Sequence, residues 1–315
     1  MKRIAILTAG GDTPALNATL HGAVTRASQL GIEVLGLLEG FRGLLSPRAP
    51  HVLLNPLFQC LPYLDPTHGG TILGSSRQYV DSHVTAQLDD AVARLRQLRV
   101  DGLICVGGDG TLSGMIPLCE HLPVVLAPKT IDNDLGLNYI DEADEYELIG
   151  GDSNEPIVRK RPEREFQLDE MINFVTPGYA TAVYVTSRSV QRIRTTAESH
   201  RRVAIIEVMG RHCGMIALGT AYGQPDFLLI PEAPPRLDDL VEAVKRRFRQ
   251  QHHAVICIAE GFQDAEGEVR GQQLEARDPA GVRFEGAAES LAEILRAKIG
   301  ERFFKEFSPH DTARE

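Results

Sequence analysis

Two carboxylates and a cation lie close together in the segment "PKTIDND". Asp132 and Asp134 flank an asparagine, and Lys129 precedes the first aspartate by three positions. The group follows the apolar run 123–127, which is typical of a buried strand. A carboxylate held beside a cation suits a general base that removes a proton from a hydroxyl group. The alternative interpretation is a turn at a strand end in which the aspartates cap backbone N–H groups.

Glycine pairs follow or end two other strand-like runs, at Gly10–Gly11 and at Gly107–Gly108. Without a Cβ atom, the backbone N–H groups of such turns can approach a phosphate closely, and a helix that starts next adds its positive end. Asp109 follows the second pair and suits Mg²⁺, directly or through water. It is also suited to cap a helix. One glycine pair is weak evidence, but two pairs together with the acidic turn predict a phosphate site.

These turns must be positioned by strands that alternate with helices along the chain. The first series comprises expected strands at 3–8, 33–40, 102–108 and 123–128 and helix-like stretches at 10–31, 89–99 and 111–122. The second comprises an expected helix at 178–200, strands at 201–210 and 226–232, a helix at 237–251 and a strand at 254–261. This order predicts an α/β fold with parallel sheets covered by helices on both faces. In such sheets ligands bind at the carboxyl ends of the strands, where the three turns lie.

Two lobes of the same class are expected to face each other across a cleft. We expect a phosphate-binding α/β lobe over 1–138, a charged insertion over 139–172 and a second α/β lobe over 173–315. Within the insertion, 146–149 and 156–160 are expected to pair as a hairpin around a Gly-Gly-Asp-Ser-Asn turn. The insertion is either a solvated surface excursion or a lid or subunit contact.

Composition and charge narrow the class of protein. The 315 residues carry a formal net charge of −10, which argues against a general affinity for nucleic acid or an anionic membrane. Five cysteines form no C-x-x-C pair, so we expect reduced core thiols in a cytoplasmic protein. The N-terminal apolar run 4–8 is too short for a signal peptide, and no apolar run is long enough to span a bilayer.

The motifs together resemble the phosphofructokinase family, from residue 2 to about 262. In family order the chain contains "LTAGGDTPALNA", "GGTILGSSR", "VGGDGT", "PKTIDNDL", "SHRRVAIIEVMGRHCG" and "IAEG". T-I-D-N-D and E-V-M-G-R together are highly specific, whereas G-G-D-G-T also occurs in NAD kinases and diacylglycerol kinases. The resemblance implies a cytoplasmic, Mg²⁺-dependent 6-phosphofructokinase of glycolysis. It would transfer a phosphoryl group from ATP to the 1-hydroxyl of fructose 6-phosphate and work as a homo-oligomer, a dimer or tetramer.

The resemblance implies roles for residues in the donor half of the site. The N–H of Gly11 resembles the one that meets the transferred group, and Arg77 resembles the arginine that bridges the donor phosphates. Asp109 resembles the Mg²⁺ ligand. The expected donor-phosphate residues are Gly11, Arg77, Gly108, Gly110, Thr111 and Lys129.

The resemblance also implies the catalytic and acceptor residues. Asp132 resembles the general base, helped by Thr130 and Asp134, and Arg211 resembles the arginine that faces the transferred phosphoryl group. The expected acceptor residues are Thr130, Asp132, Arg202, Met209, Gly210, Arg211 and Glu260. Among these, Glu260 resembles a carboxylate that holds the sugar. Arg202 resembles an arginine that reaches across a subunit interface, which requires an oligomer.

The chain departs from the family pattern in two places. The charged segment 139–172 replaces a short link. After a glutamate such as Glu260 the family usually continues into a G-H-x-Q-R-G-G motif, and this chain contains none. We therefore expect either a fragment with an incomplete sugar-phosphate lobe or an acceptor site that is built differently. The donor half of the mechanism is better supported than the acceptor half.

The phosphoryl donor depends on two positions that give opposite indications. Gly110 leaves room for the rest of a nucleotide, whereas lysine at position 129 accompanies pyrophosphate use in the family. We give Gly110 the greater weight and expect ATP, with pyrophosphate as the alternative. Two further alternatives are an NAD kinase-like enzyme, supported only by "GGDGT", and a non-catalytic regulatory or binding subunit, made plausible by the absent G-H-x-Q-R-G-G motif.

Overall fold

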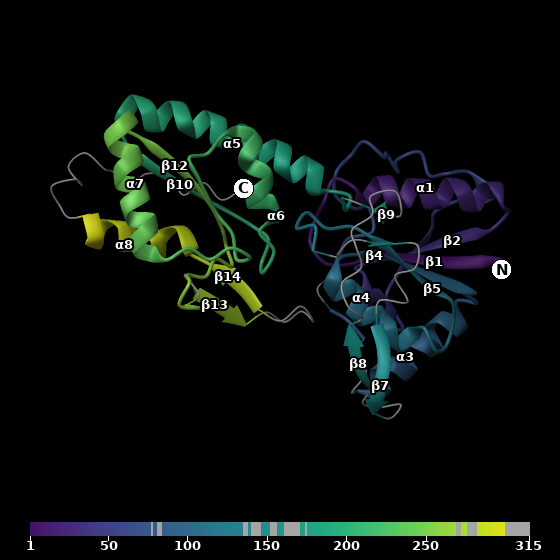
Figure 1. The fold of residues 1–315 in the computed structure, drawn as a ribbon. Coiled ribbons are helices and arrows are strands. Elements are labelled where there is room, and N and C mark those ends of the chain that lie inside the picture. Colours follow the sequence, from purple (N-terminus) through teal and green to yellow (C-terminus); the bar gives the residue numbers. More distant parts are fainter. Residues whose placement is uncertain are drawn as a thin grey trace.

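The computed structural model shows two lobes, and a long helix, α5 (Tyr179–His200), runs from the first lobe along the second (Figure 1). The structure describes residues 1–76, 78–80, 84–134, 138–139, 146–151, 156–160, 171–173, 175–268, 272–275 and 282–299. The two-lobed α/β architecture that the alternating pattern predicts is confirmed.

A five-stranded sheet forms the first lobe, in the order β3-β2-β1-β4-β5. Its strands are β1 (Arg3–Thr8), β2 (Glu33–Leu37), β3 (His51–Leu53), β4 (Gly102–Gly107) and β5 (Val124–Pro128). Neighbouring strands pair in parallel except at the edge, where β3 runs antiparallel to β2. The sequence pattern missed this edge strand because its run is only three residues long.

Helices cover both faces of this sheet, as the order of the elements predicts (Figure 1). On one face, Ile4 and Ile6 pack against α1 (Leu16–Gln29). On the other, Ala5 and Leu7 pack with side chains of three helical segments. These segments are α2 (Phe41–Leu45), α3 (Thr85–Gln97) and the 3-10 turn Ile116–Leu118. Successive side chains of β1 therefore point to opposite faces of the sheet and contribute to the apolar core on each face.

The helix expected at 111–122 is shorter than its apolar pattern suggests. Helix α4 spans Asp109–Met115 and gives way to the 3-10 turn Ile116–Leu118. Pro117 explains the change, because proline has no N–H group to donate and its ring clashes with the carbonyl of the preceding helical turn. The helix begins at Asp109, and the N-cap position is Gly108. The alternative role of Asp109 as the N-cap residue is therefore wrong.

A three-stranded parallel sheet forms the second lobe, in the order β10-β12-β11. Its strands are β10 (Val203–Val208), β11 (Phe227–Leu229) and β12 (Ala254–Ala259). One face packs on α7 (Leu237–Gln251) and α8 (Ala287–Ile299), and the other on α5 and α6 (Met215–Gly219). Every residue of β12 is buried, which explains its continuous apolar run.

The hairpin expected inside the charged insertion is present. Strand β7 (Tyr146–Gly151) pairs antiparallel with β8 (Pro156–Lys160), with Leu148 opposite Val158. Two further small ladders complete the described strands: β6 (Asn138–Tyr139) with β9 (Met171–Asn173), and β13 (Gln272–Glu275) with β14 (Val282–Glu285). The rest of the insertion lies outside the described residues.

The cysteines are free thiols, but they are not all core residues. Cys105 and Cys257 are buried in the strands, whereas Cys60 and Cys213 are half-buried and Cys119 is exposed. The expectation of core thiols is therefore wrong for Cys119, which follows the 3-10 turn after α4. Over the described ranges, no helix combines the length and apolar character needed to cross a membrane.

A buried carboxylate fixes the start of α8 in the second lobe. Glu207, in β10, is 5% exposed and accepts hydrogen bonds from the N–H groups of Gly286 (3.2 Å) and Ala288 (2.9 Å). These donors belong to the first turn of the helix and its flank, where N–H groups lack intrahelical partners. We predict that Glu207→Leu lowers the free energy of unfolding by about 1–3 kcal/mol, because the donors lose their acceptor inside the protein.

Urea unfolding monitored by circular dichroism measures this change. The matched control is Glu293→Leu, at an exposed position of the same helix, which should stay within about 0.5 kcal/mol of the parent protein. Equal effects of the two substitutions would contradict the role given to Glu207.

Candidate active site

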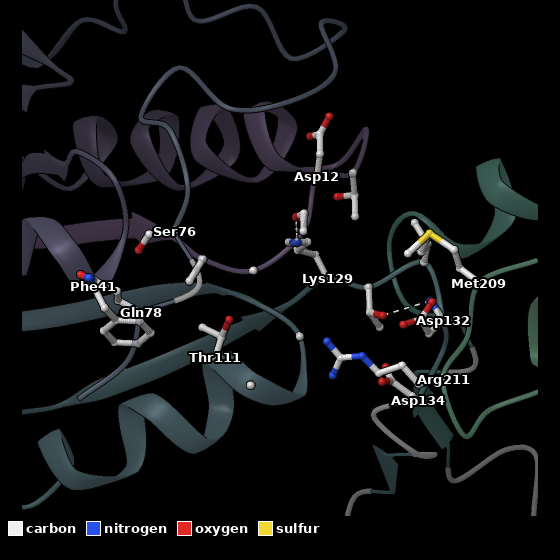
Figure 2. A pocket seen from close by; sticks show the side chains of 18 of the residues that line it. Asp12, Phe41, Ser76, Gln78, Thr111, Lys129, Asp132, Asp134, Met209 and Arg211 are labelled. Carbon is white, nitrogen blue, oxygen red and sulfur yellow. Dashed lines mark hydrogen bonds between the residues drawn. The ribbon is translucent and has the colours of Figure 1, made fainter. Parts of the chain in front are cut away.

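A cavity of about 320 Å³ lies between the two lobes and is lined by residues from both. The predicted site residues that line it are Gly11, Gly108, Gly110, Thr111, Lys129, Thr130, Asp132, Asp134, Met209, Arg211 and Glu260. Figure 2 shows Arg211 reaching in from the second lobe beside Asp132 and Asp134, with Thr111 and Lys129 further along the cavity. The motifs that the sequence places at strand ends therefore meet at one site.

Four predicted residues are not among those that line the cavity. Gly210 lies just behind the lining, where its N–H contacts Glu260. Arg202 precedes β10 whereas Met209 follows it, so the length of that strand, about 20 Å, separates Arg202 from the cavity of its own chain. Arg77 and the side chain of Asp109 lie outside the described part of the structure.

The turn after β5 presents Asp132 to the cavity. The N–H of Asp132 donates to Thr130 Oγ1 (3.0 Å), while its Oδ1 atom is buried and has no hydrogen-bond partner in the described part of the chain. The pKa of Asp132 is raised from 3.8 to about 6, mainly by burial and also by the charges of Asp134 and Glu260, whereas Arg211 and Lys129 oppose the change. A carboxylate with a pKa near neutrality is charged at pH 7 and still basic enough to accept a proton.

Lys129 is buried at the end of the same strand, with 3% of its surface exposed. Its Nζ atom donates a hydrogen bond to the carbonyl oxygen of Gly11, which Figure 2 marks with a dashed line. Burial lowers the pKa of Lys129 to about 8, and the charges of Asp12 and Asp132 oppose this decrease. The lysine therefore joins the turn after β1 to the turn after β5 and remains mostly protonated at neutral pH.

The glycine turns are tied to their neighbours by the backbone. The N–H of Gly10 donates to the carbonyl of Ser76 (3.2 Å), and Ser75 Oγ donates to the carbonyl of Gly10 (2.7 Å). Ser75 and Ser76 thus lie against the first glycine turn. At the second turn, a Cβ atom on Gly107 would lie 1.9 Å from Thr111 Oγ1, so Thr111 can pack there only because residue 107 is glycine.

Carboxylates of the second lobe hold the loop that carries Arg211. Glu260 Oε1 accepts hydrogen bonds from the N–H groups of Gly210 (3.3 Å) and Arg211 (2.9 Å). Glu232 Oε1 accepts another from the N–H of Gly214 (2.7 Å). A Cβ atom on Gly261 would lie 1.8 Å from the carbonyl oxygen of Arg211, so this backbone approach requires glycine. Arg211 itself has a left-handed backbone with φ of 51°, which the loop must stabilise.

Glu260 therefore does more than the sequence suggested. Its side chain lines the cavity, as a sugar-binding carboxylate should, but one oxygen is occupied by backbone donors. Burial raises its pKa, while the hydrogen bonds from Arg211 and Gly210 oppose this increase. Only its second oxygen is left to face a ligand without breaking those bonds.

Sequence reasoning missed several residues at the far end of the cavity. Phe41, Ser76 and Gln78 line it there (Figure 2), and Asp12 and Thr13 line it beside the first glycine turn. Asp12 and Thr13 belong to the first glycine motif, so that motif was the available signal. Phe41 begins α2 and no pattern in its own segment marks it as a ligand-facing residue.

The arrangement combines a desolvated base, a facing guanidinium and backbone turns that suit phosphate groups. Phosphoryl transfer requires little covalent help from a protein beyond positioning and charge stabilisation of this kind. Residues of both lobes line the cavity, so a phosphoryl donor bound by the first lobe would meet an acceptor bound by the second.

Comparison with known proteins agrees with this chemistry. A family model described as Phosphofructokinase matches residues 3–140 and 169–308. ATP-dependent 6-phosphofructokinase 2 of Streptomyces coelicolor is 38% identical over 303 residues, which are 95% of this chain and 76% of that protein. The pyrophosphate–fructose 6-phosphate 1-phosphotransferase of Dictyoglomus thermophilum is 35% identical over 302 residues, which are 95% of this chain and 75% of that protein.

A solved structure is similar to this chain in fold. The phosphofructokinase from Saccharomyces cerevisiae superposes with a TM-score of 0.64 at 25% identity, over 93% of this chain and 37% of that chain. The two relatives named above use different phosphoryl donors according to their names, so similarity alone does not identify the donor.

The raised pKa of Asp132 makes a prediction about stability. Because the folded state binds this proton more tightly than the unfolded state, the contribution of Asp132 to stability is fully present below pH 3.8 and is lost as the pH rises through about 6. Asp132→Asn removes the titration. We compare the unfolding free energy of Asp132→Asn with that of the parent protein at each pH. We predict that the difference, variant minus parent, increases by up to about 3 kcal/mol from pH 4 to pH 7.5.

Urea unfolding at several pH values measures the difference between the two proteins, so that any pH-independent cost of the amide cancels. Asp89→Asn, at an exposed position of α3, is the control for the loss of a carboxylate elsewhere. A difference between parent and Asp132→Asn that is constant over this pH range would refute the desolvation of Asp132.

Proposed function

This chain belongs to the phosphofructokinase family, and on that basis we propose that it is a 6-phosphofructokinase that uses ATP. The reaction moves the γ-phosphoryl group of ATP to the 1-hydroxyl of fructose 6-phosphate, and the products are ADP and fructose 1,6-bisphosphate. The observation that carries the proposal is the desolvated carboxylate of Asp132, which shares one cavity with Arg211 and the two glycine turns.

Asp132 is the general base of the proposed reaction. It accepts the proton of the 1-hydroxyl as that oxygen attacks the γ-phosphorus, and the bond between phosphorus and the bridging oxygen of ADP breaks. Arg211, which reaches in beside the base, stabilises the charge on the transferring group. The N–H of Gly11 and the side chain of Thr111 hold the donor phosphates, together with Arg77, Gly108 and Gly110.

Mg²⁺ is the proposed cofactor, and the residues of the site suit it. No group of three or more ligating side chains occurs within the described ranges, but Mg²⁺ bound with a nucleotide takes most of its ligands from phosphates and water. Asp134 and Asp12 line the cavity with carboxylates, and Asp109 precedes Gly110 in the phosphate turn. When bound, the ion neutralises negative charge on the phosphates. We assign it to Asp109, with Asp134 helping to organise the ion and the base.

The acceptor lies on the second lobe in this proposal. Met209, Gly210 and Glu260 form its pocket, and Arg202 binds the sugar phosphate of a neighbouring subunit. The distance of Arg202 from its own cavity supports this arrangement. So does an apolar surface on α5 and the turns after α6, where Tyr184 is 66% and Tyr222 81% exposed. We therefore propose a homo-oligomer, a dimer or tetramer, that acts in glycolysis in the cytoplasm.

The test of the function is a coupled assay of purified protein with ATP, fructose 6-phosphate and Mg²⁺. We expect turnover, and we expect Asp132→Ser to lower kcat by at least about 10²-fold while the binding of a non-hydrolysable ATP analogue changes little. Asp89→Asn, already used as a surface control, should match the parent protein. Near-parent turnover of Asp132→Ser would show that another group removes the proton. An inactive parent protein that still binds the analogue would favour a regulatory or binding subunit.

Pyrophosphate is the alternative donor, and the relative from Dictyoglomus thermophilum favours it as much as Lys129 does. We predict a higher kcat/KM with ATP than with pyrophosphate at saturating Mg²⁺. Gly110→Asp should reduce kcat/KM for ATP at least about tenfold relative to pyrophosphate, since a carboxylate there repels the α-phosphate; tenfold is about 1.4 kcal/mol. A tenfold preference of the parent protein for pyrophosphate would show instead that Lys129 determines the donor.

A further inference from the structure

The asparagine between the two aspartates has no part in the scheme above. We propose that Asn133 is a positioning residue for the general base: it locks the turn that presents Asp132 by joining it to Thr176, at the entrance to α5. The inference rests on the proposed function, because it concerns the same carboxylate. Its evidence comes from the backbone of the turn and from the contacts of Thr176.

The carboxylate of Asp132 depends on its backbone for its position. Its Oδ1 atom has no hydrogen-bond partner among the described residues, so that atom gives the side chain no anchor. The backbone, by contrast, is held at both polar groups. The N–H donates to Thr130 Oγ1 (3.0 Å), and the carbonyl accepts a hydrogen bond from Cys213 Sγ of the second lobe (3.3 Å). A small shift of this backbone would therefore move the base.

The next residue, Asn133, has a left-handed backbone with φ of 59°. Few residue types other than glycine adopt this conformation readily, and asparagine is one of them. The chain changes direction at Asn133, and both flanking aspartates line the cavity. The conformation alone would suit glycine better, so the side chain of Asn133 needs a separate explanation.

Thr176 supplies that explanation. Asn133 Oδ1 accepts a hydrogen bond from the backbone N–H of Thr176 (2.8 Å) and lies 3.1 Å from its hydroxyl oxygen. The hydroxyl of Thr176 also lies 3.1 Å from the carbonyl oxygen of Thr130. One hydroxyl proton serves only one of these acceptors at a time, whereas the N–H of Thr176 donates to Asn133 Oδ1. Thr176 is 1% exposed, so its donors are shielded from water.

The contact joins the base to the helix that spans both lobes. A short parallel bridge pairs Thr130 with Gly178, and α5 begins at the next residue, Tyr179. Figure 1 shows this end of α5 beside the first lobe and the rest of the helix along the second. The segment of Thr176 to Gly178 is therefore a fixed support for the turn, and the amide of Asn133 is the side chain that attaches the turn to it.

The test compares two substitutions of Asn133 that separate its backbone from its side chain. Asn133→Gly keeps the left-handed conformation accessible and removes the acceptor. Asn133→Asp keeps an acceptor oxygen and tolerates the same conformation, but it adds a third carboxylate to the turn. The exposed Thr195→Val of α5 is the control, because Thr195 lies far along the helix from the turn. Steady-state kinetics with ATP and fructose 6-phosphate, thermal unfolding and ¹³C NMR of the Asp132 carboxylate are the measurements.

We expect Asn133→Gly to lower kcat about 10- to 100-fold, because small displacements of a reacting group have effects of this size. The KM values for ATP and fructose 6-phosphate should change less than about threefold, and Asn133→Asp should retain most of kcat at its optimal pH. A merely structural role would lower the thermal midpoint and leave kcat per folded molecule unchanged. That result would overturn the proposal, as would parent-like kinetics of Asn133→Gly or equal losses of kcat in both variants.

The pH dependence of kcat gives a second test, because the two variants should shift it in opposite directions. The groups around Asp132 are Asp134 and Glu260, which raise its pKa, and Arg211 and Lys129, which lower it. In Asn133→Gly the loosened carboxylate gains water, so the acid side of the kcat profile should move to lower pH. In Asn133→Asp the added charge should move it to higher pH. Shifts in the same direction, or none, would contradict a role through Asp132.

The NMR measurement separates failure of this inference from failure of the proposed function. If the parent protein lacks phosphofructokinase activity, the function fails, but the pKa of Asp132 should still differ between the parent and both variants in these directions. If the parent protein is active and neither variant alters kcat or that pKa, the function stands and the role of Asn133 is refuted. Thr195→Val should match the parent protein in every measurement.

Discussion

The structure depends on keeping one carboxylate out of water between two lobes. Asp132 gains basicity from its burial, and the negative charges of Asp134 and Glu260 increase it. A desolvated charge is unfavourable for folding, so the surrounding backbone must hold it against the tendency to turn toward solvent. The turn after β5 is accordingly bonded within itself, to the segment before α5 and to Cys213. These bonds connect the turn that carries Asp132 to both lobes that line the cavity.

The second lobe uses acidic side chains in a different way. Glu260, Glu232 and Glu207 each accept hydrogen bonds from backbone N–H groups that would otherwise lack partners. Glu260 and Glu232 hold the loop of Arg211, and Glu207 holds the start of α8. These carboxylates therefore have a structural role in the second lobe. Within the described part of the chain, the positive charge in the cavity comes from other residues, Lys129 and Arg211.

The sequence predicted the elements and the motifs more fully than the contacts between them. Continuous apolar runs predicted β4, β5 and β12, and the hairpin of β7 and β8 followed from two short runs around a glycine turn. The antiparallel β3 was missed because three residues carry no period. The bond between Asn133 and Thr176 spans 43 positions, and that between Glu260 and Arg211 spans 49. Both contacts join segments that are far apart in the sequence, and local patterns do not encode which distant segments the fold brings together.

The two positions that gave opposite indications about the donor both line the cavity but belong to different elements. Lys129 directly follows β5 and is bonded across to Gly11, whereas Gly110 lies in the first turn of α4. A lysine bound in this way stabilises the loop after β1 and offsets the charges of Asp12 and Asp132, which any phosphoryl donor requires. A lysine that is held by the protein backbone in this way is compatible with either donor. Our proposal of ATP therefore depends on Gly110, where the absence of a side chain would leave room for the rest of a nucleotide.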